Sequence, residues 1–161
     1  MFKSFVKSNF CVLLLALIVV SVAILNFQPG TWLTGWDTLH PEFDYSLNLK
    51  RLFSGVWREE QGLGALAAHA HMSDLPRVFI LMVLDLFLPT RSVKYIFNLF
   101  CLILGPIGIF FLIKFLFKGK SKSKLKDSAA LIGALFYLFN LATVQHFHVV
   151  FEMFAVQYAA I

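Results

Sequence analysis

Three carboxylates gather in the polar stretch 35–66, which has apolar runs on both sides: Asp37, Glu42 and Asp44. A carboxylate at a lipid–water boundary can act as a general base, since burial raises its pKa toward the useful range. A structural interpretation stands beside this one. Asp37 can cap a turn, and Glu42 and Asp44 can occupy a first helical turn, where acids interact favourably with the helix dipole. The residue types alone leave both interpretations open.

Four cations lie in or near the same stretch and could contact a lipid phosphate or diphosphate through charge-assisted hydrogen bonds. The alternative is that their long side chains reach the bilayer surface and bind anionic headgroups non-specifically. The four residues are Lys50, Arg51, Arg58 and Arg77.

A third group, His69, His71 and Asp74, has side chains that could ligate a divalent metal ion. The two-residue spacing of the histidines places them on different faces of a helix, which makes a shared metal a poor fit. The sequence therefore indicates no certain cofactor, and a divalent metal ion is the one candidate. Asp85 lies inside an apolar run, where an ionisable residue indicates function unless it reaches water.

The composition places these groups in a membrane protein. Hydrophobic residues form 59% of the 161 residues, 19 are Phe, and the mean hydropathy is +0.77. A chain with so little polar surface needs lipid to cover it. The net charge of +5 lies in short flanks of apolar runs, which indicates topology rather than a nucleic-acid partner. Both cysteines lie in apolar runs, so no disulfide framework is expected.

Apolar runs predict about three transmembrane helices, over 8–27, 95–117 and 128–144, each long enough to cross the bilayer. Lys3 and Lys7 precede the first run and place the N-terminus in the cytoplasm. A cleaved signal peptide is the alternative, but no small-x-small cleavage site follows a short apolar core. We therefore predict an all-α membrane protein with a long first outer loop, 28–94.

The outer loop is expected to carry amphipathic and interfacial helices. Pro41 suits the first position of a helix, and the apolar residues that follow recur at three- and four-residue spacing. The segment 77–89 is short and ends at Pro89, which favours an interfacial or re-entrant segment. A non-crossing 77–89 also leaves the five lysines of 118–126 in the cytoplasm. The expected apolar face comprises Tyr45, Leu49, Leu52, Phe53 and Val56.

The last residues remain apolar to Ile161, with Gln145, His146, His148 and Glu152 among them. No basic flank closes this run. We therefore expect residues 1–161 to form a single N-terminal membrane region of a larger protein.

Several short motifs occur in an order that resembles a known family. They are Gly35-Trp-Asp37, the segments 45–52 and 55–60, Gly62-Leu-Gly64, Phe87-Leu-Pro89, Gly105-Pro-Ile-Gly108 and Phe136-Tyr-Leu-Phe-Asn140. This order resembles the N-terminal region of YfhO-like bacterial multi-span proteins, which in turn resemble the GT-C membrane glycosyltransferases. The resemblance covers nearly the whole chain.

The resemblance implies a membrane-embedded glycosyltransferase of the bacterial inner membrane, with 28–94 extracytoplasmic. A sugar would move from a polyprenyl-phosphate donor to an envelope glycan or protein. Asp37 takes the position of the catalytic acid, with Glu42 and Asp44 as second candidates, and the cations, Arg58 and Arg77 first, would face the donor phosphate. The chain lacks the adjacent acidic pair of the best-known family pattern, which leaves the choice among the three acids open. The alternative is a non-enzymatic membrane protein, either half of a transporter or an envelope assembly factor.

Overall fold

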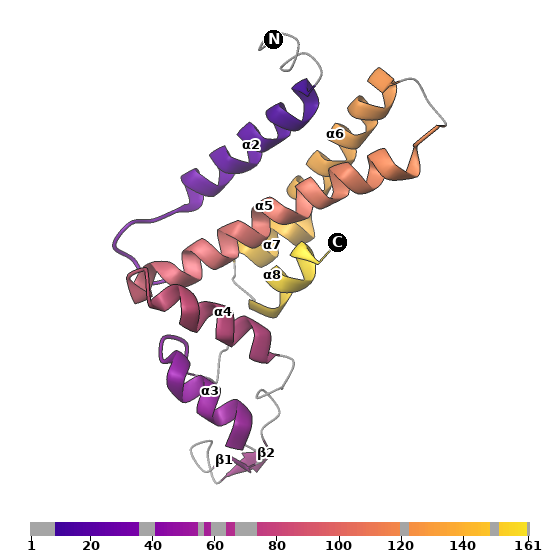
Figure 1. Ribbon diagram of the computed structural model, residues 1–161. Helices are drawn as coiled ribbons and strands as arrows, with labels where there is room; N and C mark the ends of the chain where they lie inside the picture. Colours follow the sequence, from indigo (N-terminus) through magenta and orange to yellow (C-terminus); the bar gives the residue numbers. More distant parts are fainter. Residues whose placement is uncertain are drawn as a thin grey trace. The chain divides into compact units, whose positions relative to one another are not determined.

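The computed structural model describes residues 9–35, 41–54, 57–58, 64–66, 74–119, 123–148 and 152–160 (Figure 1). This part of the chain is helical apart from one pair of two-residue strands, so the predicted all-α class is confirmed. The chain divides into two compact units. Unit 1 comprises Met1–Gln28 with Asn98–Ile161, and unit 2 comprises Pro29–Phe97.

One helix in the described residues, α5 (Thr90–Leu116), is long and apolar enough to cross a membrane. It begins five residues before the predicted 95–117, because the polar first turn after Pro89 is already helical: the Ser92 N–H donates to the Pro89 carbonyl at 2.7 Å. The helix continues through Pro106, which is buried. The apolar helix α2 (Phe10–Asn26) is shorter, at 17 residues.

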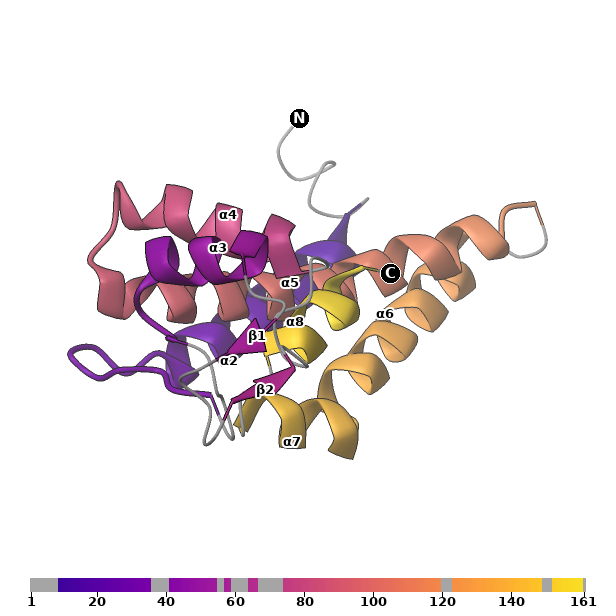
Figure 2. The same ribbon diagram turned by 90° about the horizontal axis from the view of Figure 1, so that it is seen from below.

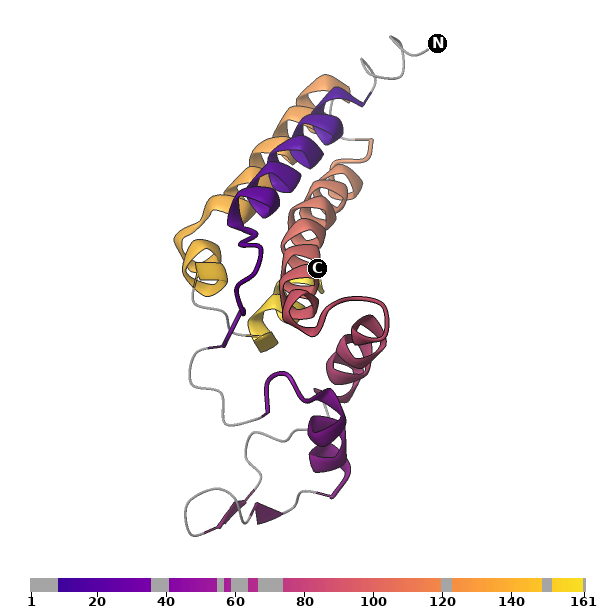
Figure 3. The same ribbon diagram turned by 90° about the vertical axis from the view of Figure 1, so that its left-hand side faces the viewer.

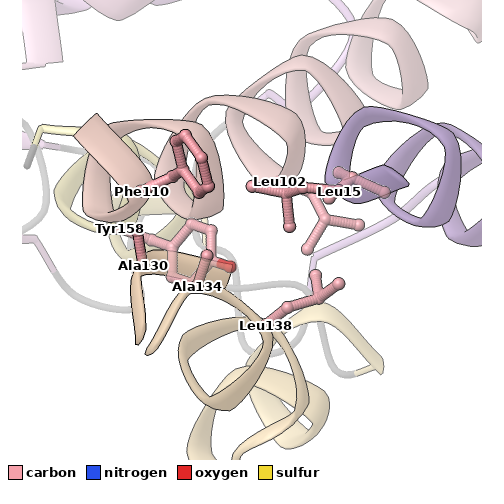
Figure 4. Packing of buried hydrophobic residues seen from close by; sticks show 8 residues of the cluster. Leu15, Leu102, Phe110, Ala130, Ala134, Leu138 and Tyr158 are labelled. Carbon is pink, nitrogen blue, oxygen red and sulfur yellow. The ribbon is translucent and has the colours of Figure 1, made fainter. Parts of the chain in front are cut away.

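Unit 1 is a helical bundle of α2, the later part of α5, α6 (Ser123–Phe139), α7 (Leu141–His148) and α8 (Glu152–Ala159). Helices α2 and α6 pack side by side (Figure 3). Lys114 near the end of α5 pairs with Asp127 of α6 at 2.8 Å, across the loop that joins the two helices. The core contains Leu15, Val19, Leu102, Phe110, Ala130, Ala134, Leu138 and Tyr158 (Figure 4).

Glycines allow two close approaches inside unit 1. A Cβ atom at Gly105 would lie 2.3 Å from a ring carbon of Tyr158, and one at Gly133 would lie 2.3 Å from Cδ1 of Ile113. Small residues let packed helices come close together, as in membrane bundles. The Gly-Pro-Ile-Gly motif in α5 thus provides the surface on which Tyr158 rests.

A helix break falls inside the third predicted span, 128–144. Helix α6 stops at Phe139, and Asn140 begins a separate helix, α7. The Asn140 carbonyl accepts the Val144 N–H at 3.1 Å, and its side-chain oxygen accepts the Thr143 N–H at 3.0 Å. Asn140 therefore caps α7, and asparagine is among the residues favoured in that role. An apolar run predicts burial or lipid contact, and the one signal for the break is Asn140 itself, a candidate N-cap inside that run.

Unit 2 contains α3 (Tyr45–Ser54), α4 (Leu75–Asp85), the first turns of α5, and strands β1 (Trp57–Arg58) and β2 (Ala65–Leu66). The strands pair antiparallel, with Trp57 opposite Leu66. Helix α3 packs against α4 (Figures 1 and 2). At 11 residues α4 is about 16 Å long, far less than the roughly 30 Å of hydrocarbon in a bilayer.

The predicted start of the amphipathic helix at Pro41 is wrong by four residues. Pro41 instead opens a turn, in which its carbonyl accepts the Asp44 N–H at 3.4 Å and the Asn48 side chain at 3.3 Å. Helix α3 then begins at Tyr45.

The buried face of α3 also differs from the predicted one. Tyr45 is buried as expected, but Asn48 is buried too, whereas Phe53 is 65% exposed. Leu49 and Leu52 are partly buried, and Val56 lies outside the described residues. The reason is that Asn48 hydrogen-bonds to the Pro41 turn, which turns this polar residue toward the interior.

Candidate functional site

A largely buried ion pair joins Glu42 and Lys94 within unit 2. The Lys94 side chain is 2% exposed and the Glu42 side chain 12%. The backbone N–H of Gly35 also donates to Glu42, at 2.9 Å from Oε2 and 3.1 Å from Oε1. A buried charge needs a partner of opposite sign, because water no longer solvates it. Glu42 therefore serves here as the counter-ion of Lys94.

Aromatic rings cover this ion pair. The Lys94 ammonium lies 4.9 Å from the centre of the Phe43 ring, a cation–π contact. Trp32 meets the same ring edge-on, with 4.6 Å between the centroids. The Thr31 and Tyr95 hydroxyls hydrogen-bond at 2.7 Å. Through these contacts the segment after α2 packs against the start of α5.

A second set of polar groups surrounds the contact between α3 and α4. Arg77 is 7% exposed, and its guanidinium lies 3.4 Å from the Asp74 carboxylate. Burial, followed by the charge of Asp85, raises the pKa of Tyr45 to about 12, and the charge of Arg77 acts in the opposite direction. Burial lowers the pKa of Lys94, with a smaller contribution from the charge of Arg77, and the pairing with Glu42 acts in the opposite direction. We call Glu42, Tyr45, Arg77, Asp85 and Lys94 the polar cluster of unit 2.

Asp44 lies outside this cluster and has a local role. Its Oδ1 accepts the Leu47 N–H at 2.9 Å and the Ser46 hydroxyl at 2.8 Å, so it caps α3. These hydrogen bonds, the Leu47 N–H first, and the nearby charge of Arg51 lower the pKa of Asp44 below its ordinary value of 3.8. Asp44 therefore has a structural role, but the expectation that Glu42 and Asp44 occupy the first helical turn is wrong, since α3 begins at Tyr45 and both acids precede it.

The remaining predicted site residues are spread out. Lys50 is exposed and Arg51 is half-buried. Arg58 lies in β1, where the structure describes its backbone. Asp37, His69 and His71 lie outside the described residues. Asp74, the third predicted metal ligand, pairs with Arg77, and the described residues hold no group of three metal-ligating side chains.

Sequence reasoning did not select Lys94 or the hydroxyl of Tyr45. Lys94 is flanked by Val93 and Tyr95 and precedes a long apolar run. An ionisable residue in such a run indicates a functional or paired charge, and this signal could have identified it. Tyr45 was predicted only as part of an apolar helix face, because its ring dominates that pattern.

Comparison of the chain with models of known protein families, with curated proteins and with solved structures finds no match.

Proposed function

We propose that this chain belongs to a membrane-embedded glycosyltransferase and that unit 2 binds the phosphate of a polyprenyl-phosphate sugar donor. The observation that carries the proposal is the burial of two cations in unit 2, Arg77 of α4 and Lys94 of α5. An arginine fork suits a phosphate because it donates two parallel hydrogen bonds, and a lysine adds a point charge. Asp74 and Glu42 balance the two cations, and a phosphate would compete with them.

The proposed membrane location is supported by the surface of unit 1. Large apolar side chains are exposed on three of its helices, whereas a water-soluble bundle rarely leaves so many uncovered. Lipid would cover them, with the N-terminus in the cytoplasm and 28–94 on the outer face of the bacterial inner membrane. They are Phe10, Leu17, Ile24 and Leu25 of α2, Phe100, Phe111 and Phe115 of α5, and Ile132, Phe136 and Phe139 of α6.

Within this proposal Asp37 is the general base. Glu42 and Asp44 remain second candidates, but each already accepts hydrogen bonds: Glu42 from Lys94 and Gly35, and Asp44 from Leu47 and Ser46. The acceptor would be an envelope glycan or protein. No step of this proposal requires a metal ion.

The test is sugar transfer by the purified full-length protein in lipid nanodiscs, from a polyprenyl-phosphate sugar donor. Asp37→Asn should lower turnover about 100-fold or more, because it removes the proton acceptor and keeps the size. Arg77→Met should raise the KM for the donor. Arg91→Met, which removes an exposed cation from α5, is the matched control and should change neither value. Unchanged turnover in Asp37→Asn, Glu42→Gln and Asp44→Asn would remove the catalytic proposal.

A non-enzymatic membrane protein is the second candidate, and one observation favours it. Glu42 and Asp44, the two predicted acids that the structure describes, both act as structural partners. In a transporter half or an assembly factor, the polar cluster would hold unit 2 together without chemistry. Donor binding by the wild-type protein without any sugar transfer would favour this candidate.

A further inference from the structure

We infer that Tyr45 and Asp85 bind a sugar hydroxyl in unit 2. Tyr45 is 4% exposed, and its hydroxyl has no hydrogen-bond partner in the part of the chain that the structure describes. Within the same residues, Oδ1 of Asp85 is also buried without a partner. Nearly all buried polar atoms in proteins are hydrogen-bonded, so two unsatisfied atoms need an explanation.

The two atoms belong to neighbouring elements. Tyr45 is the first residue of α3 and Asp85 is the last residue of α4, and these helices pack against each other. Figure 1 shows α3 beginning beneath α4. After burial, the charge of Asp85 is the next contribution that raises the pKa of Tyr45.

The hydrogen-bonding capacity of the pair fits an alcohol. A phenol hydroxyl can donate, whereas an ionised carboxylate can only accept. One alcohol O–H satisfies both, since its oxygen accepts from Tyr45 and its hydrogen goes to Asp85. A single group of this kind would therefore satisfy two buried atoms.

The surrounding charges select a neutral ligand group. Asp85 would repel a phosphate, whereas its carboxylate can accept a hydrogen bond from a neutral hydroxyl. Arg77 also acts on Tyr45 and would repel an ammonium group. A neutral hydroxyl is repelled by neither Asp85 nor Arg77. Sugars present several such hydroxyls, which makes the acceptor glycan of the proposed transferase the ligand class. In this respect the inference rests on the proposed function.

The experiment measures binding of methyl glucoside, methyl galactoside and methyl mannoside, without donor, to the full-length protein in nanodiscs by saturation-transfer NMR. Saturable binding of at least one glycoside to the wild type is expected. Tyr45→Phe and Asp85→Asn should each weaken it about 10-fold, the usual effect of removing one hydrogen bond to a ligand. Phe53→Leu, at a 65% exposed position of α3, is the control and should leave binding unchanged.

Two results would contradict this inference. Absence of saturable binding in the wild type, or unchanged affinity in both variants, would overturn the inference and leave ordered water as the partner of the two atoms. If Asp85→Asn does not fold, the glycoside affinity of Tyr45→Phe tests the inference by itself. Because the assay contains no donor, a protein that binds glycosides but transfers no sugar would refute the proposed function only. Transfer that proceeds normally in both variants, with no glycoside binding, would refute this inference only.

Discussion

Lys94 of α5 pairs with Glu42, which precedes it by 52 residues, and the ammonium group also lies over the ring of Phe43. The lysine side chain is almost completely buried. Its charge is therefore stabilised by the protein and not by water. Removal of one partner from a buried ion pair leaves an uncompensated charge, which is far more costly than replacement of both.

This relationship predicts a specific pattern of stability. Glu42→Gln should lower the free energy of unfolding by about 3–5 kcal/mol, because it removes the carboxylate that pairs with the buried Lys94 ammonium group. The double variant Glu42→Gln with Lys94→Met should recover much of the loss. Denaturant titration in mixed micelles, followed by tryptophan fluorescence, measures both, since Trp32 packs on Phe43. A loss below about 1 kcal/mol for Glu42→Gln would contradict the pairing, as that is the scale of an exposed ion pair.

The cap of α3 predicts a dependence on pH. The pKa of Asp44 is lower in the folded chain than its ordinary value of 3.8. Its stabilising contribution is therefore fully present above the unfolded pKa and is lost as the pH falls through the folded pKa. Amide hydrogen exchange at Leu47 and Asn48 should accelerate relative to the intrinsic rate in that acidic range. In Asp44→Asn the capping side chain remains but cannot ionise. The protection of the Leu47 and Asn48 amides should therefore show no such loss in the acidic range. The same acid dependence in both proteins would exclude Asp44 as the cause.

Two glycines of unit 1 should respond differently to alanine. At Gly105 the new methyl group would meet three ring atoms of Tyr158 within 2.9 Å, and that ring is stacked on Tyr137 with 4.5 Å between centroids. At Gly133 it would meet mainly Cδ1 of Ile113, the end of a flexible side chain. Gly105→Ala should therefore destabilise by about 1–3 kcal/mol, the usual cost of overpacking. Gly133→Ala is the matched control and should cost less. Thermal unfolding in detergent compares the two, and equal losses would show that the Tyr158 ring can move aside.

The predicted topology can be tested at the basic loop. The five lysines of 118–126 favour the cytoplasm, and the short α4 supports a segment that does not cross. A cysteine at Ser121, in a chain with Cys11 and Cys101 replaced by serine, should resist an impermeant thiol reagent in intact cells and react after permeabilisation. A cysteine at Thr31, in the same background, should react from outside. Labelling of the Ser121 cysteine in intact cells would rule out this topology.

The sequence by itself determined the helical class and the approximate positions of the long helices. Apolar runs of about 20 residues satisfy their backbone groups internally only as helices when lipid or a core surrounds them, and this holds without knowledge of any neighbour. The end of the apolar segment before Pro89 was also a local property, because proline geometry acts within one turn.

Only the tertiary structure decided which charged groups meet. Glu42 and Lys94 are too distant in sequence for any spacing rule to pair them, and the pair exists because the segment after α2 folds onto the start of α5. The rotation of α3 was decided in the same way. Its apolar spacing predicts an amphipathic helix. The contacts with the Pro41 turn and with α4 determine which face is buried, and that face contains Asn48 and Tyr45. A polar group is buried where a partner can satisfy it, and the identity of that partner is a property of the folded chain.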